Sequence, residues 1–305
     1  MFRTLFLLSL LLWLPLSSAH SSQAPTVVAS IPPLHSLVAG VMAGIAEPVL
    51  LIRGNTSVHT YSLRPSQMRT LHRARVIFRI GSNLESFLDR PLATLKESIR
   101  VVNLMEWPGI RLLPARGGGL WGEHSHRRHE HAYLDPHIWL DPRNAELMVD
   151  AVITALAASD PEHAPRYREN GARLRKSLRQ LDRALAAELA PVRDVPYLVF
   201  HDAYQYFESR YGLHAAGAII ATPDRTPGAR RLREVKRLIR EKEIRCLFRE
   251  PQFTPAWLQL ISEETQLKIG TLDPLGASLE PGPDLYFTLM RRLAASLTDC
   301  LSKPE

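Results

Sequence analysis

PEHAPRYRENGARLRKSLRQLDRALAAELA, residues 161–190, is the segment that organises this chain. At 1.5 Å per residue, a helix of this length would span about 45 Å, longer than one small domain. We therefore expect one rigid helix over residues 161–191 that joins two lobes and is ended by Pro191 and Pro196. Its apolar residues step by three, four and seven, as in an amphipathic helix: Tyr167, Leu174, Leu178, Leu181, Leu185 and Leu189.

On both sides of this segment, short β-branched apolar runs alternate with longer amphipathic runs, as in α/β units. The first half predicts strands at 26–31, 49–52, 76–80 and 101–104, and helices at 34–42, 65–74, 84–99 and 145–158, the last capped by Asn144. The second half predicts strands at 197–200, 216–220, 246–248 and 269–272, and helices at 202–211, 228–242, 255–266 and 283–300. The sequence thus predicts an α/β protein of two similar (β/α)4 lobes, residues 20–160 and 192–305.

The N-terminus has the pattern of a secretory signal peptide. Arg3 supplies a positive charge, residues 5–16 are almost wholly apolar, and Ser17-Ser18-Ala19 offers small residues for cleavage. The apolar run is too short for a comfortable membrane span. We expect residues 1–19 to be removed after Ala19 and the mature chain to be exported.

The charge of the chain does not indicate a nucleic-acid partner. The net charge is +7 and the isoelectric point is near 9.6. However, the arginines are scattered along predicted helices, and no aromatic residues interleave with them as a base-stacking platform requires. We expect a solvated basic surface and no nucleic acid.

Cys246 and Cys300 are the only cysteines of the sequence. An even count in an exported protein favours a disulfide, with two free buried thiols as the alternative. Neither cysteine has a C-x-x-C partner, which disfavours a cysteine metal site.

Three histidines lie in or directly after predicted strands or loops that would border one cleft, namely His59, His137 and His201. Ligands of open α/β sheets bind beyond the carboxyl ends of the strands. Glu250 and Asp273 also follow predicted strands. Imidazole is the commonest protein ligand for metals such as zinc, so we expect a metal cleft between the lobes. For each histidine alone, a hydrogen-bonded structural role is the alternative, and Asp273 alone could cap a turn.

A histidine-rich tract, EHSHRRHEH at residues 123–131, lies in a predicted loop over 117–134. Short tracts of this kind bind metals weakly. Arg127 and Arg128 oppose binding by like-charge repulsion. A solvated loop without a role is the alternative to weak metal binding by His124, His126, His129 and His131.

Four motifs together resemble the ZnuA-type periplasmic zinc-binding proteins, the cluster A-I receptors of bacterial ABC zinc importers. The resemblance runs from about residue 25 to 301 and rests on NTSVHTYSLRPSQ (55–67), DPHIWLDPRNA (135–145), VFHDAYQYF (199–207) and LDPLG (272–276). It implies a periplasmic, monomeric, high-affinity Zn²⁺ receptor that is not an enzyme and delivers the ion to an ABC permease.

The resemblance also implies the ligands, which are His59, His137 and His201. Asp273 stands at an aspartate that contributes a ligand in parts of the family. The manganese-binding branch carries a glutamate at the position of His201, and three imidazoles favour zinc over manganese. Some zinc-binding members have a glutamate where this chain has Val58, so the fourth ligand here is expected to be Asp273, whose carboxylate would offset the charge of the ion, with water as the alternative. The pairing of the two cysteines also resembles a disulfide of zinc-binding members.

Two other functions compete with this interpretation. A zinc hydrolase also uses three histidines and an open position, with Glu250 as a conceivable base, but the sequence lacks the H-E-x-x-H pattern. A periplasmic zinc buffer or chaperone that works without a transporter is the second.

Overall fold

The structure, a computed structural model, describes residues 24–54, 56–116, 133–220, 227–253 and 256–302. The predicted signal peptide with its cleavage after Ala19 lies outside these residues. So do the histidines of the tract, namely His124, His126, His129 and His131. Within the described ranges, no helix is both long and apolar enough to cross a membrane.

The N-terminal lobe is built on a parallel sheet with the strand order β2-β1-β3-β4. Its strands are β1 (Val27–Ala29), β2 (Val49–Leu50), β3 (Val76–Arg79) and β4 (Arg100–Asn103). Helices α1 (Pro32–Met42), α2 (Pro65–Arg73), α3 (Ser82–Glu85), α4 (Asp89–Ala93) and α5 (Pro142–Ser159) accompany them. Short 3₁₀ helices lie at η1 (Val58–Thr60), η2 (Ser86–Leu88), η3 (Leu104–Glu106) and η4 (Ile138–Leu140).

Two local predictions for this lobe are wrong. The helix expected over 84–99 is broken into α3, η2 and α4, since Pro91 lacks the N–H that a continuous helix would need there and its ring clashes with the preceding turn. The cap of α5 is Asp141 and not Asn144: the Asp141 carboxylate accepts a hydrogen bond from the Arg143 N–H at 2.9 Å. Asn144 instead donates to the backbone oxygens of Arg111 and Ile138.

The C-terminal lobe repeats the same topology, with the order β6-β5-β7-β8. Its strands are β5 (Tyr197–His201), β6 (Ala215–Ile220), β7 (Cys246–Arg249) and β8 (Lys268–Thr271). Its helices are α7 (Gln205–Tyr211), α8 (Ala229–Glu241), α9 (Ala256–Thr265) and α10 (Leu285–Leu301). In each lobe the order is second-first-third-fourth, which confirms the prediction of two similar parallel-sheet lobes. Such an order reverses beside its first strand, where open α/β sheets bind ligands.

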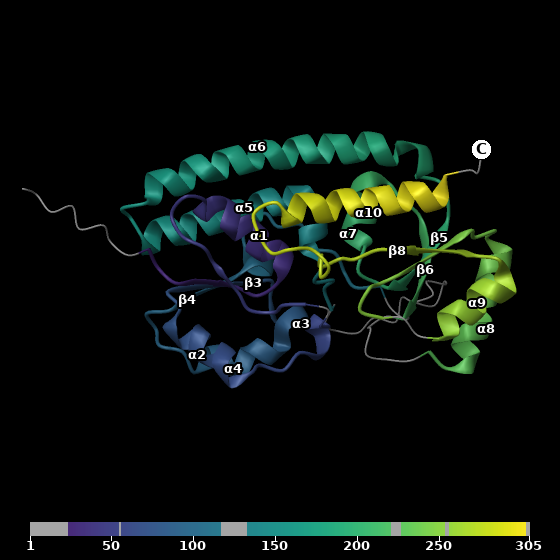
Figure 1. The fold of residues 1–305 in the computed structure, drawn as a ribbon, viewed down its shortest axis with the longest axis horizontal. Helices are drawn as coiled ribbons and strands as arrows, with labels where there is room; N and C mark the ends of the chain where they lie inside the picture. The colour runs from purple at the N-terminus through teal and green to yellow at the C-terminus, as the bar shows by residue number, and fades with distance from the viewer. Residues whose placement is uncertain (1–23, 55, 117–132, 221–226, 254–255, 303–305) are drawn as a thin grey trace, which may run out of the picture.

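Helix α6 (Ala164–Leu189), followed by the short η5 (Ala190–Val192), is the predicted long helix. Its 26 residues span about 39 Å, and it runs above both lobes with α10 beneath it (Figure 1). Its apolar stripe is buried, and the helix packs against α5, α1 and α10. Burying each leucine of the stripe contributes roughly 1.5–3 kcal/mol, so the helix is held along its length by packing.

At Gly171, helix α6 packs closely against α5. A Cβ added there would clash with Cδ1 of Ile153 and lie 2.7 Å from its Cγ1. We expect Gly171→Val to lower the free energy of unfolding by about 1–3 kcal/mol through overpacking, measured by chemical denaturation. Gly282→Val is the matched control, because nothing lies within 4 Å of a Cβ at that position. Equal losses in both variants would contradict close packing as the cause.

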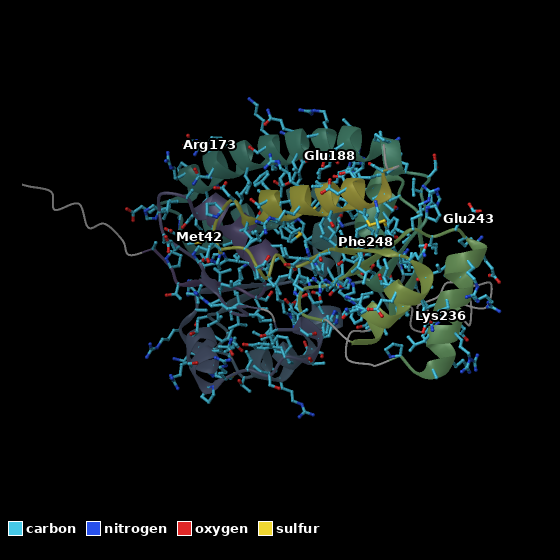
Figure 2. The ribbon with its side chains drawn as sticks, turned by 45° about the vertical axis from the view of Figure 1, so that its right-hand side comes forward. Met42, Arg173, Glu188, Lys236, Glu243 and Phe248 are labelled. Atoms are coloured by element: carbon cyan, nitrogen blue, oxygen red, sulfur yellow. A yellow bond between two sulfur atoms is a disulfide. The ribbon has the colours of Figure 1, made fainter. Side chains whose placement is uncertain are left out.

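The predicted disulfide is present between Cys246 and Cys300, whose Cα atoms lie 6.1 Å apart. It joins the first residue of β7 to the last turns of α10, and Figure 2 draws it as a yellow bond close to Phe248. Since α10 also packs on α6 and α1, the disulfide fastens a helix shared by both lobes to the C-terminal sheet.

Candidate metal centre

The three predicted histidines come together from both lobes. His59 lies in η1 after β2, with its N–H donating to Ser57 Oγ at 3.3 Å. His137 precedes η4, and His201 is the last residue of β5, at the reversal of strand order in the C-terminal sheet. The site therefore lies where the lobes meet.

The geometry of the cluster suits one ion. One potential ligand atom from each histidine lies within 4.8 Å of the other two. The ring centroids are 5.1 Å apart for two of the pairs and 5.6 Å for His59 with His137. Nitrogens around a tetrahedral zinc are roughly 3.4 Å apart, so small inward shifts of the rings would place them all on a common ion. His137 and His201 are buried, while His59 is partly exposed.

Each buried ring is oriented by a carboxylate. His137 Nδ1 lies 2.7 Å from Asp135 Oδ1, which also accepts the His137 backbone N–H at 3.0 Å. His201 Nδ1 lies 3.1 Å from Glu250 Oε1, just after β7. When Nδ1–H donates to a carboxylate, the Nε2 lone pair is free to bind a metal, and this arrangement is typical of zinc-binding histidines.

Burial sets the charge state of these groups. It lowers the pKa of His137 to about 3 and raises the pKa of Asp135 to about 7. Burial would also lower the pKa of His201, but Glu250, Asp202 and Asp135 together outweigh burial, so that pKa is raised above its usual 6.5. The His137 ring is therefore neutral at all physiological pH values, whereas the His201 ring would have to give up a proton before it could bind a cation in mildly acidic solution.

No fourth potential ligand joins the three histidines among the residues that the structure describes. Val58, at the position of the missing glutamate, is buried in the core. The Asp273 carboxylate is not part of the histidine cluster and holds a turn: its Oδ1 accepts hydrogen bonds from the N–H groups of Leu275 at 3.1 Å and Gly276 at 2.9 Å. Asp273 as a ligand remains a prediction.

Buried hydrogen bonds fix the lobes to each other around the cluster. Trp139, two residues after His137, donates from Nε1 to the Pro274 oxygen at 2.8 Å. The Tyr286 hydroxyl of α10 donates to the Trp139 oxygen at 2.8 Å. The turn held by Asp273 is therefore tied to the segment that carries His137.

The sequence interpretation missed Asp135. It placed Glu250 at the end of a strand near the expected metal cleft and gave it a conceivable role as a base, but it did not pair Glu250 with His201. The sequence did contain a signal for Asp135, because an aspartate side chain often accepts a hydrogen bond from the backbone N–H two residues further along the chain, which here belongs to His137. No local signal pairs His201 with Glu250, which are 49 positions apart.

Two α/β lobes under a long helix, with three histidines gathered between them, define a two-lobed metal-binding protein. The family model described as zinc-uptake complex component A, periplasmic, matches residues 27–300. This chain therefore belongs to that family, ZnuA.

Relatives support the assignment over the whole chain. The high-affinity zinc uptake system protein ZnuA of Brucella suis biovar 1 (strain 1330) is 41% identical, with 98% of each chain covered. Its namesake from Yersinia pestis is 31% identical, with 94% of each covered. In fold, the chain matches a crystal structure of ZnuA (TM-score 0.79, 24% identity) and the periplasmic zinc-binding protein TroA from Treponema pallidum (TM-score 0.78, 20% identity). Each match covers 92% of this chain and 100% of the other.

Proposed function

We propose that this protein is a periplasmic high-affinity zinc receptor that binds one Zn²⁺ between its lobes and delivers it to an ABC-type import permease. The observation that carries the proposal is the convergence of His59, His137 and His201 at the meeting of the lobes. Membership in a zinc-uptake family supports the same function. The receptor would be exported after cleavage at Ala19 and act as a monomer.

Zinc is the ion that fits the donor set best. Three imidazoles are borderline-soft donors that suit zinc, whereas manganese prefers more oxygen ligands. Two of the rings are preoriented by carboxylates, which also offset the charge of a dication in a buried site. Asp273 or a water would complete a tetrahedron.

Substitution of Asp273 tests the fourth ligand. We expect Asp273→Ala to keep one bound zinc and to lose less than about tenfold in affinity, because the Asp273 carboxylate already accepts hydrogen bonds from three backbone N–H groups of the turn. The measurement is zinc titration against a chelator of known affinity. A loss of about a hundredfold or more, with the fold retained, would instead make Asp273 the fourth ligand.

The histidine-rich tract has a separate proposed role. His124, His126, His129 and His131 would capture zinc weakly and exchange it with the main site, without being needed for tight binding. The composition of the tract supports this role, which is secondary to the cleft.

The two competing functions make different predictions in cells and in solution. A receptor needs its transporter, so deleting the gene should reduce zinc uptake from chelator-treated medium, and a plasmid copy should restore it only when the permease is present. Restoration without the permease would favour a zinc buffer or chaperone. Hydrolysis of ester or peptide substrates by the zinc-loaded protein, lost on metal removal, would favour a hydrolase.

A further inference from the structure

A short antiparallel pair of segments carries one of the carboxylates of the metal centre. Leu113–Arg116 and Tyr133–Asp135 form this pair, which we call the stem. The Ala115 N–H donates to the Tyr133 oxygen at 2.7 Å, and the Asp135 N–H donates to the Leu113 oxygen at 2.9 Å. Because Asp135 holds His137, any movement of the stem is transmitted to that ring.

The stem is anchored on the opposite lobe through helix α7. The Tyr206 hydroxyl accepts the Leu113 N–H at 2.9 Å and donates to the Asp135 backbone oxygen at 2.9 Å. This anchor fixes the position of the stem backbone. Tyr206 does not connect the stem to Asp202, the residue that follows His201.

Arg116 provides that link. Its Nε lies 3.1 Å from each carboxylate oxygen of Asp202, and its Nη2 also donates to Asp202. Its Nη1 donates to Glu208 of α7 at 2.7 Å. The Asp202 and Glu208 side chains are each only 6% exposed, and that of Arg116 is 21% exposed. A planar guanidinium holds two carboxylates in a fixed geometry, which a point charge does not.

We propose that Arg116 is a positioning residue of the metal centre: it ties the stem that carries Asp135 to the residue that follows His201, and so holds His137 and His201 in register across the lobes. This inference rests on the proposed zinc-binding function of the three histidines. Arg116 acts through Asp135 and Asp202 and would not itself touch the ion.

Removing the guanidinium would loosen the site in two ways. Asp202 and Glu208 would remain as two largely buried carboxylates that repel each other. The stem would also lose its anchor on Glu208 of α7. Since metal sites need their ligands held within roughly 0.5 Å of the productive geometry, we expect a looser site with the same three ligands.

The test compares Arg116→Met with the wild-type protein in two metal assays. We expect zinc affinity, measured by chelator competition, to fall about 10–100-fold while one ion still binds, which is the range for loss of groups that orient ligands. We also expect the visible spectrum of the Co²⁺-loaded protein to change in band position and intensity, because that spectrum reports the ligand geometry. Arg116→Lys keeps the positive charge but not the planar guanidinium that bridges two carboxylates. This variant should show an intermediate loss of zinc affinity at an unchanged melting temperature.

Arg111→Met is the matched control. Arg111 leaves the same segment of the N-terminal lobe and also reaches α7, where its Nη2 donates to Ser209 Oγ at 2.8 Å, but it contacts neither carboxylate. We expect this variant to match the wild type in affinity and in its Co²⁺ spectrum. An equal loss in Arg111→Met would mean that any weakened contact between the lobes has this effect, and it would overturn the specific role of Arg116.

The remaining outcomes also decide the matter. Wild-type affinity and spectrum in Arg116→Met would overturn the proposal. If Arg116→Met does not fold, Arg116→Lys decides in the same two assays, and wild-type behaviour of that variant is the contrary result. The triple alanine variant at His59, His137 and His201 is measured alongside. Tight binding that survives in it overturns the zinc-receptor function, and a wild-type protein that binds no zinc overturns both.

Discussion

Replacing His59, His137 and His201 together by alanine should abolish tight zinc binding. The three rings supply all the nitrogen ligands of the cluster, and the two oriented carboxylates cannot form a tetrahedral site at the same place without them. We expect the affinity to fall by on the order of a thousandfold or more. Native mass spectrometry of the protein from His20 onward, with zinc titrated against a chelator, should show one tight ion in the wild type and none in the variant.

Weak binding should survive in that variant, because the histidine-rich tract is unchanged. A control with alanine at the exposed His72 and His214 should keep the tight ion. Far-ultraviolet circular dichroism of the metal-free proteins checks that removing two buried rings has not unfolded the lobes. If the tight ion persists in the triple variant, the metal lies elsewhere in the chain and the mechanism proposed for the cleft fails.

Removing the disulfide should cause the largest loss of stability of the changes considered. Cys246 and Cys300 are 54 residues apart, and closing a loop of that length stabilises the folded state by roughly 4 kcal/mol in the chain-entropy model. We expect the double variant Cys246→Ala, Cys300→Ala to lose about this amount, measured by denaturant unfolding under oxidising conditions.

Zinc stoichiometry should stay at one in the double variant. Cys246 begins β7, whereas Glu250 and the histidine cluster lie beyond the opposite ends of the strands. Wild-type protein unfolded in the presence of a reductant is the control and should approach the stability of the variant. A difference below about 1 kcal/mol between oxidised wild type and variant would show that the packing of α10 on α6 and α1 holds the helix without the covalent bond.

Local patterns predicted much of the architecture. The leucine stripe of residues 161–190 predicted α6, because helical periodicity is a property of neighbouring residues. The short apolar runs placed all eight strands within two residues of their observed bounds. The local prediction over 84–99 was wrong where it ignored Pro91, although that residue is a local signal too.

The candidate site was also predicted in part from the sequence. The positions of His59, His137 and His201 near the ends of strands and loops predicted their convergence, because parallel strands bring their carboxyl ends to one edge of a sheet. The role of Asp273 was open from the sequence, since an aspartate before a proline suits a turn as well as a metal. Its hydrogen bonds to Leu275 and Gly276 are contacts of the folded turn.

By itself, the sequence determined the lobes, the long helix, the family and the identity of the three histidines, since these depend on periodicity and on motifs of a few adjacent residues. Only the tertiary structure decided which residues distant in the sequence orient those histidines. The pairing of His201 with Glu250, and of Arg116 with Asp202 and Glu208, joins residues 49 to 92 positions apart. These residues meet because of the way the two sheets and α7 pack together, and the periodicity of the sequence does not indicate which distant residues will be in contact.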